Sequence, residues 1–135
     1  MAASDEVAGL FLDAIRRRDF DALSGCLHPM VQLRALRPGD AVVRIGASAV
    51  TERLAGWFGG WDEAETLRAD AWEVAGRLAI AYRIRVRSAA GTREVEQHLY
   101  CDMTGQQITA IDLLCSGFRP VPQPPPSPEP WRSGR

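Results

Sequence analysis

Polar and apolar residues follow a helical spacing near the start of the chain. Five apolar residues recur there at intervals of three and four: Val7, Leu10, Phe11, Ala14 and Ile15. This spacing predicts a helix with one buried stripe. Ser4 stands at the expected N-cap, ahead of two acidic residues that favour the positive helix end. We expect the arginines at 16–18 to close the helix and stay solvated, where they complement the negative end of its dipole.

Two further helices and a first hairpin follow in the pattern. Asp19 is placed to cap a short second helix that turns Phe20 and Leu23 inward and ends at His28-Pro29. Residues 31–36 and 41–45 predict a hairpin around Pro38-Gly39, because this pair suits a tight reversal. A third helix is predicted over residues 48–58, and we expect a left-handed residue at Gly59-Gly60 to stop it. Its apolar stripe consists of Val50, Leu54, Trp57 and Phe58.

Residues 64–118 change to an extended pattern. They form four strand-like segments joined by three short connections that each contain a glycine: Val74-Ala75-Gly76, Ala89-Ala90-Gly91 and Met103-Thr104-Gly105. Helices followed by a long antiparallel meander predict an α+β fold in which the helices cover one face of a curved, mostly antiparallel sheet. Such a sheet leaves an open mouth, so we expect a small-molecule pocket.

The hairpin registers decide which side chains face that pocket. Glycine stands third in each connection, which suits a three-residue loop with a glycine bulge and pairs residues 73 with 77, 88 with 92, and 102 with 106. The alternative is a two-residue loop at Ala90-Gly91, which pairs Arg87 with Glu94 and Arg85 with Glu96. We favour the bulged register because one loop geometry then serves three times.

The bulged register divides the side chains of the sheet into two sets. The face expected to line the pocket carries Asp70, Trp72, Leu78, Ile80, Tyr82, Ile84, Glu96, His98, Tyr100, Ala110, Asp112 and Leu114. The opposite face carries Arg83, Arg85, Gln97, Leu99, Cys101, Ile111 and Leu113. The second set mixes charge with aliphatic surface, which a second subunit could cover.

Length and composition limit the possible partners. The 135 residues suffice for one domain, which we place at residues 1–119, followed by a flexible tail at 120–135 that holds seven of the nine prolines. A PxxP ligand for a partner protein is the alternative use of that tail. A net charge of −1 gives no electrostatic reason to expect a nucleic acid or an anionic membrane as partner.

The cysteines and the amino terminus predict a cytoplasmic protein. Cys26, Cys101 and Cys115 are odd in number and lack metal-site spacing, so we expect reduced apolar residues in the core. The start of the chain is acidic where a secretory signal would be basic, and no apolar run approaches membrane-spanning length.

At the level of pattern the chain resembles the NTF2-like proteins, and within them the SnoaL-like polyketide-cyclase branch. The resemblance spans residues 5–119 and rests on residues 19–23, on Leu27-His28-Pro29, on residues 46–50 and on the two closing strands at 94–102 and 106–119. It implies an α+β cone with a deep pocket, and a homodimer formed through the outer sheet. It implies no single activity, because this fold hosts isomerases, dehydratases, cyclases, epoxide hydrolases and non-catalytic binders.

The sharpest site hypothesis is an acid/base pair of His98 and Asp112 on adjacent closing strands, similar in placement to the histidine and aspartate of SnoaL-like cyclases. An imidazole beside a carboxylate in an apolar pocket could move a proton at a carbon next to a carbonyl. Tyr82 or Tyr100 could donate to the developing enolate oxygen. Further pocket residues expected on the same face are Trp72, Asp70 and Glu96. The alternatives are a structural histidine in the sheet, and Tyr82 and Trp72 as core residues.

Other chemistries lack their required motifs. The sequence has no GxGxxG, Walker or GxSxG motif, and only two histidines that could serve a metal site, so we expect no cofactor and no metal. The helix at the start carries no tyrosine and the first hairpin offers only Asp40, so a steroid-isomerase pattern is missing. Two functions remain open: cofactor-free isomerase, cyclase or dehydratase chemistry on a small apolar carbonyl compound, and non-catalytic ligand binding or dimerisation.

Overall fold

The structure is a computed structural model that describes residues 2–122, and side chains from residue 4 onward. The predicted proline-rich tail lies mainly outside these residues. Three helices occur in the described part: α1 (Ala2–Arg17), α2 (Phe20–Gly25) and α3 (Ala47–Phe58). The strands of the same part are β1 (Leu27–Arg37), β2 (Asp40–Ile45), β3 (Glu63–Val74), β4 (Arg77–Ser88), β5 (Gly91–Thr104), β6 (Gln107–Cys115) and β7 (Arg119–Pro120). No helix in the described range is long and apolar enough to cross a membrane.

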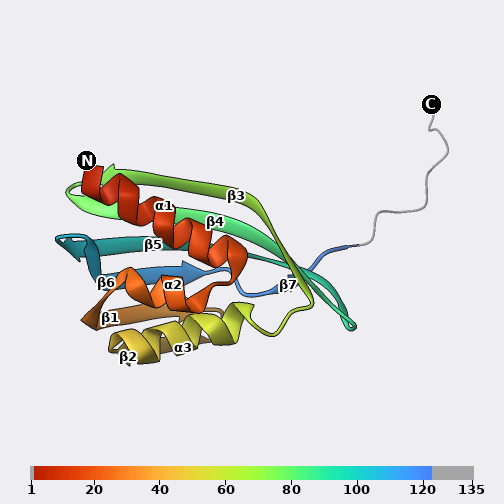
Figure 1. Ribbon diagram of the computed structural model, residues 1–135. Coiled ribbons are helices and arrows are strands. Elements are labelled where there is room, and N and C mark those ends of the chain that lie inside the picture. Colours follow the sequence, from red (N-terminus) through yellow and green to blue (C-terminus); the bar gives the residue numbers. More distant parts are fainter. Residues whose placement is uncertain (1, 123–135) are drawn as a thin grey trace.

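The three helices lie together on one face of a single curved sheet (Figure 1). The strand order is β2-β1-β6-β5-β4-β3, and β7 adds a short pairing to β5. Only β1 and β6 run parallel among these neighbours, so the sheet is mostly antiparallel, as the sequence predicts. We call the face under the helices the inner face and the opposite face the outer face.

Helix α1 buries a slightly different stripe from the predicted one. Ala8 is buried with Val7, Phe11, Ala14 and Ile15, whereas Leu10 is 57% exposed. The helix begins at Ala2, so the expected N-cap at Ser4 is wrong. At about 100° per residue, Ala8 and Leu10 lie at opposite edges of the stripe, so the buried face is rotated toward Ala8 and away from Leu10.

The later helices keep their predicted buried faces but not all of their ends. The Asp19 carboxylate accepts a hydrogen bond from the Ala22 N–H at 3.1 Å, which confirms the cap of α2. That helix ends at Gly25, and His28-Pro29 belongs to β1 instead. All four predicted core residues of α3 are buried. Gly59 follows α3 with a φ of −83°, so the expected left-handed stop is wrong.

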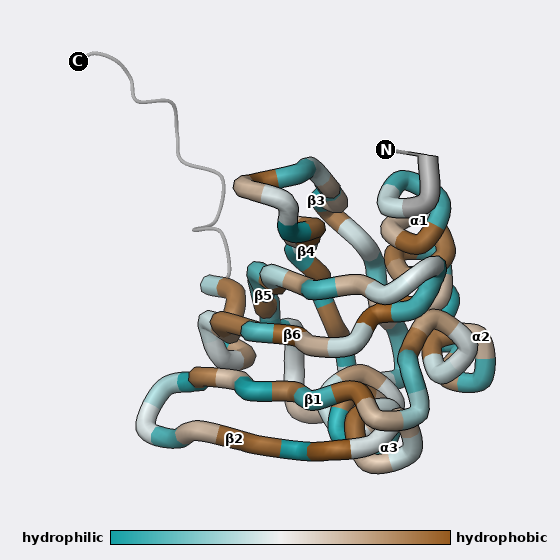
Figure 2. Tube along the Cα trace, turned by 90° about the vertical axis from the view of Figure 1, so that its left-hand side faces the viewer, coloured by the Kyte–Doolittle hydropathy of each residue, from teal (hydrophilic) through white to brown (hydrophobic). Residues whose placement is uncertain are grey.

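The core lies between the helices and the inner face of the sheet. Brown and teal segments alternate along the middle of β1 (Figure 2), where buried and exposed residues also alternate. The largest buried side chains include Tyr82, Phe11 and Phe58, and Gln97 is the one buried polar residue among the described positions. All three cysteines are buried and free, which fits their predicted role in the core.

The predicted hairpin registers are wrong in all three connections. The observed pairs that close the loops are Val74 with Arg77, Ser88 with Gly91, and Thr104 with Gln107, so each loop has two residues. The alternative register at β4–β5 is wrong as well, because Arg85 lies opposite Glu94 and not Glu96. Relative to the bulged register, the β4–β5 pairing slips by one residue, which turns every side chain of β5 to the other face.

The observed register at the β3–β4 hairpin places an alanine in a strained turn position. Ala75 adopts a φ of 51° in the β3–β4 loop, a conformation that costs an alanine about 1–2 kcal/mol. In return, the apolar alternation of β4 faces the helices together with that of β5. The strands contain bulges near Leu67 and Thr109, where the pairing register shifts by one residue. The prediction had placed the bulges at the loops.

Replacing Ala75 by glycine tests this strain. We expect Ala75→Gly to raise the free energy of unfolding by about 0.5–1 kcal/mol, because glycine adopts positive φ without a steric penalty. The matched control is Ala90→Gly in the β4–β5 loop, where φ is not positive and glycine only adds entropy to the unfolded chain. Urea unfolding of both variants measures the difference, and a loss of stability in both would show that Ala75 is unstrained.

Candidate functional site

His98 and Asp112 lie on the outer face of the sheet. His98 pairs across the sheet with Ala81 and Leu114, and Asp112 pairs with Tyr100. Both side chains are about one third exposed, at 36% for His98 and 34% for Asp112. The expectation that they face the interior is therefore wrong, because the β4–β5 register differs from the predicted one. Their catalytic role stays a prediction.

Each of these residues has a charged neighbour on the outer face. Arg34 Nε lies 2.9 Å from Asp112 Oδ1, and Arg77 Nη2 lies 3.1 Å from Asp112 Oδ2. The hydrogen bond from Arg34, with a further one from Arg77, holds the pKa of the Asp112 carboxyl below its usual value. His98 Nε2 contacts Glu96 Oε2 at 2.6 Å rather than Asp112. This hydrogen bond, and a second from Arg83, lower the pKa of Glu96.

The other predicted pocket residues divide between the two faces. Trp72 and Tyr100 flank Ala79 on the outer face and are partly exposed. Asp70 lies on the same face, where Arg68 Nε donates to its carboxylate at 2.7 Å. Tyr82 alone of the predicted residues faces the core, and it is fully buried. Their roles in binding a substrate stay predictions.

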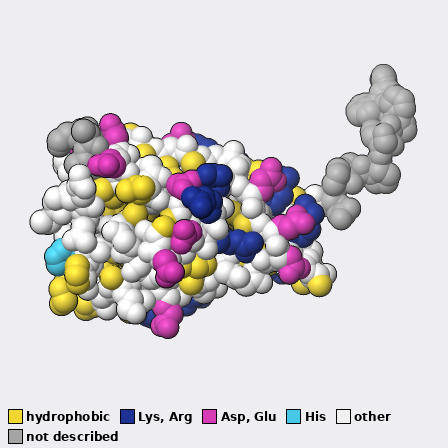
Figure 3. Space-filling view, viewed as in Figure 1, with side chains coloured by type: hydrophobic (Ala, Val, Ile, Leu, Met, Phe, Trp, Pro, Cys, Tyr) yellow, Lys and Arg dark blue, Asp and Glu magenta, His cyan; other side chains and the backbone are white. Residues whose placement is uncertain are grey.

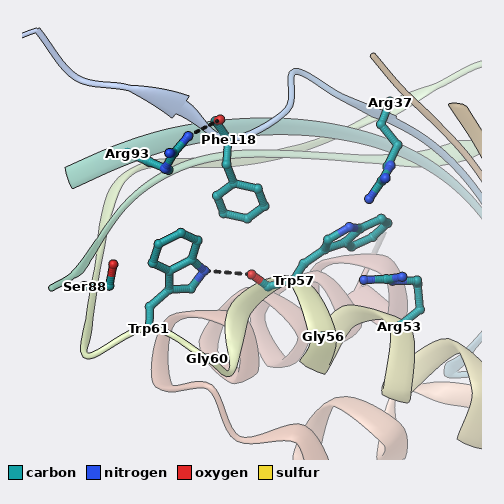
Figure 4. A pocket seen from close by; sticks show the side chains of 9 residues that line it. All are labelled: Arg37, Arg53, Gly56, Trp57, Gly60, Trp61, Ser88, Arg93 and Phe118. Carbon is teal, nitrogen blue, oxygen red and sulfur yellow. Dashed lines mark hydrogen bonds between the residues drawn. The ribbon is translucent and has the colours of Figure 1, made fainter. Parts of the chain in front are cut away.

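A pocket opens at the end of the fold where α3 stops and the β4–β5 hairpin begins (Figure 4). Its volume is about 540 Å³. Three aromatic and three cationic side chains dominate its lining: Trp57, Trp61, Phe118, Arg37, Arg53 and Arg93. We call this the open-end pocket. A smaller cavity of about 290 Å³ adjoins it, shares Arg37, Trp57 and Phe118, and reaches Cys115.

Stacked rings build the aromatic wall of the open-end pocket. Trp61 stacks on Phe118 with ring centroids 5.4 Å apart and planes inclined by 24°. Phe118 then meets Phe58 edge-on at 6.0 Å, and Phe58 meets Tyr82 edge-on at 6.1 Å. These contacts connect the pocket to the core, so the position of the wall follows from the packing beneath it.

Hydrogen bonds hold the loop that carries Trp61. The indole Nε1 of Trp61 donates to the Trp57 carbonyl at 2.9 Å. Arg18 Nη1 donates to the carbonyls of Phe58 at 3.2 Å and Trp61 at 2.6 Å, and so occupies acceptors that α3 leaves free at its end. The expectation that Arg18 is simply solvated is therefore wrong.

The segment after β6 supplies the other side of the wall. Strand β7 pairs with β5, and the Val121 N–H donates to the Thr92 carbonyl at 3.1 Å. Gly117 has a φ of 82°, and a Cβ there would lie 3.1 Å from Pro38 Cγ. A glycine is therefore needed to bring Phe118 over the pocket.

The three arginines give the open-end pocket a positive field. The Arg53 guanidinium lies 4.9 Å from the centroid of the Trp57 ring, and Arg93 Nη1 donates to the Phe118 carbonyl at 3.4 Å (Figure 4). Arg37 pairs with Asp40 at 3.0 Å. Among the described lining residues there is no aspartate, glutamate or histidine. The arrangement can attract a negatively charged group and offers aromatic surface beside it.

A buried polar chain lies beneath the wall. The Tyr82 hydroxyl donates to Gln97 Oε1 at 2.6 Å, and Gln97 Nε2 contacts Cys115 Sγ at 3.3 Å. Burial raises the pKa of Tyr82 well above its ordinary value, so the phenol stays neutral. Gln97 was expected on the outer face, and the apolar neighbours Val95 and Leu99 at alternate positions are the signal that could have placed it inside.

The described side chains provide no obvious metal site. Within residues 2–122 no group of three or more His, Cys, Asp or Glu side chains is close enough to hold a metal ion. The open-end pocket instead offers guanidinium groups, which bind anions.

Comparison with solved structures identifies the fold. An NTF2-like protein from Burkholderia xenovorans LB400 aligns with a TM-score of 0.65 and 15% identity, over 86% of this chain and 91% of that one. A protein assigned as a polyketide cyclase from Xanthomonas campestris pv. campestris aligns with a TM-score of 0.67 and 16% identity, over 84% and 90% of the two chains. The structure of TerC co-crystallised with polyporic acid gives 0.66 and 17%, over 82% and 89%.

These likenesses confirm an NTF2-like α+β cone. At such identities they show the fold alone. Neither a scan against protein-family models nor a search of curated proteins found a match.

Removing the Tyr82 hydroxyl tests the buried polar chain. We expect Tyr82→Phe to cost about 1–3 kcal/mol of stability, because Gln97 Oε1 then lacks its buried donor. The double variant Tyr82→Phe with Gln97→Leu should cost less than the sum of the single changes, since both partners are then apolar. Urea unfolding measures these values, with Tyr100→Phe on the exposed outer face as control. Strict additivity would rule out the bond between Tyr82 and Gln97.

Proposed function

We propose that this chain binds a small molecule in the open-end pocket. The observation that carries the proposal is the wall of Trp57, Trp61 and Phe118 beside arginines with no acidic side chain in the described lining. A volume of about 540 Å³ lies in the range of known ligand sites. Aromatic walls with a few placed polar groups are the usual composition of such sites.

The fold supports a small-molecule site. TerC shares the fold and was co-crystallised with polyporic acid, which shows that a protein with this architecture can take up a small organic acid. Only the shared fold carries this support to the present chain, because the two sequences are 17% identical.

The chemistry of the lining favours binding over proton transfer. Arginine stays protonated at accessible pH, so Arg37, Arg53 and Arg93 supply fixed positive charge and no general base. The alternative is the acid/base chemistry at His98 and Asp112 that the sequence predicts, and such a site would lie on the outer face. Binding without transformation is therefore the function we infer for the open-end pocket.

Mapping ligands by their effect on tryptophan signals tests this location. We expect members of a fragment library of neutral, cationic and anionic compounds to shift the indole N–H resonances of Trp57 and Trp61 in ¹⁵N-labelled protein. The internal control is Trp72, which lies on the outer face and should stay unchanged. Shifts confined to Trp72 would place binding beside His98 and Asp112, and no shift of Trp57 or Trp61 by any fragment would end the proposal.

We also propose that the outer face joins two copies of this chain in a homodimer. Several large apolar side chains are exposed there: Leu36, Val43, Ile45, Trp72, Tyr100 and Leu114. Between them lie ion pairs such as Arg34 with Asp112 and Arg83 with Glu96. Because these charges are already paired, a second copy could cover the face without repulsion between like charges.

A charge placed in the apolar part of the outer face tests the homodimer. We expect Leu114→Glu to shift the protein to monomer, because the carboxylate would lose its water at the interface. The control is Leu10→Glu on α1, where leucine is about equally exposed, at 57% against 59% for Leu114. Analytical ultracentrifugation gives the mass of each. A wild-type monomer, or a dimer that Leu114→Glu leaves intact, would count against this interface.

A further inference from the structure

Most positive charges of the described residues are already neutralised by a neighbour. The sequence contains no lysine, so every cationic side chain except histidine is an arginine. The arginines that form ion pairs with aspartate or glutamate are Arg16, Arg17, Arg34, Arg37, Arg68, Arg77, Arg83, Arg85 and Arg87. On the helix-covered face, blue and magenta side chains lie next to one another for the same reason (Figure 3). Paired charges hold little attraction for a ligand.

The open-end pocket departs from this pattern. Within residues 4–122, neither Arg53 nor Arg93 pairs with a carboxylate, and both line the pocket, Arg53 beside Trp57 and Arg93 beside Phe118 (Figure 4). Arg119, which lines the adjoining cavity, also has no acidic partner in this part of the chain. Five arginines of the described residues have no acidic partner, and three of them, Arg53, Arg93 and Arg119, lie at this end of the fold.

The Arg53 side chain has a hydrogen-bond donor without an acceptor among the described atoms. Its Nε atom is buried and has no hydrogen-bond partner among the described atoms, which is costly for a charged donor. Its guanidinium rests over Trp57, so the cation is held beside an aromatic ring. The helix leaves room for this position through Gly56, because a Cβ there would lie 3.0 Å from Arg53 Nη2.

We propose that the ligand of the open-end pocket is an aromatic carboxylate. Its ring packs on the wall of Trp57, Trp61 and Phe118, and its carboxylate binds Arg53, which lies beside Trp57. Arg93 lies at the Phe118 side of the pocket and adds a weaker, longer-range attraction. The guanidinium group is planar and matches the two oxygens of a carboxylate, whereas the wall favours a ring over a small inorganic anion. This inference rests on the proposed function and specifies the chemical class of its ligand.

Two ligands that differ in charge alone test the class. Naphthoate and naphthamide carry the same ring system, and calorimetric titration gives the affinity of each. We expect naphthoate to bind at least about tenfold more tightly than naphthamide, since only the carboxylate forms charge-assisted hydrogen bonds with Arg53. Its affinity should also fall when NaCl is raised, because salt screens the attraction.

Arginine variants locate the charge recognition. We expect Arg53→Gln to weaken naphthoate binding by about tenfold and Arg93→Gln by about threefold, and both to leave naphthamide within about twofold. The matched control is Arg44→Gln, which removes an exposed arginine on β2 that donates to the Val43 carbonyl. This control changes net charge by the same amount without touching the pocket.

A variant that moves Arg53 without removing its charge separates position from net charge. In Gly56→Ala the new methyl group would lie 3.0 Å from Arg53 Nη2, so the guanidinium shifts by a few tenths of an ångström and naphthoate binding should fall by about twofold to threefold. Stability should be unchanged or higher, because alanine is the better helix former within α3. A binding loss in this variant therefore cannot arise from unfolding.

The outcomes distinguish the ligand class from the existence of the site. Equal affinities for naphthoate and naphthamide, or losses in Arg53→Gln and Arg93→Gln no larger than in Arg44→Gln, overturn the carboxylate assignment and leave the pocket as a binding site. Failure of naphthoate to bind also overturns the assignment. The pocket itself fails as a site only when no fragment of any charge shifts Trp57 or Trp61.

Discussion

The pairing of β4 with β5 is the constraint on which the rest of the structure depends. It places Tyr82 opposite Gln97 on the inner face and Ala81 opposite His98 on the outer face. A slip to the predicted register would turn Glu96 and His98 into the core, where an ionised group without a partner costs several kcal/mol. Neither Ala89 nor Ala90 in the β4–β5 loop has a positive φ, so no strained turn opposes the observed register, and the burial of charge decides it.

The sequence predicts the architecture well because the architecture follows from periodicity. Apolar spacing located all three helices and the four long strands, and the alternation within β4 correctly put Tyr82 inside and Arg83 outside. Register depends on several small energies, from turn conformation, cross-strand pairs and burial, and glycine positions alone do not decide it. One wrong register was therefore enough to reverse the expected orientation of His98 and Asp112.

The open-end pocket escaped prediction because its residues share no local motif. Arg53 and Trp57 come from α3, Trp61 from the loop after it, Arg93 from β5, and Phe118 from the segment after β6. Only the folded chain brings these segments together. The available signal was the cluster of aromatic residues around Gly59-Gly60, of which the helix pattern assigns Trp57 and Phe58 to the core and leaves Trp61 without a role.

Side chains fill the interior of the cone, so the site that we propose for a ligand lies at its rim. Tyr82 and Phe58 are buried beneath the aromatic wall, and the hydroxyl of Tyr82 is already bonded to Gln97. These polar groups have their partners, so they offer little to an incoming molecule. Arg53 and Arg93 line the pocket at the rim and have no carboxylate partner among the described residues. If the proposed function holds, selectivity at this end of the fold comes from charge at the mouth, and the packed interior holds the aromatic wall in place.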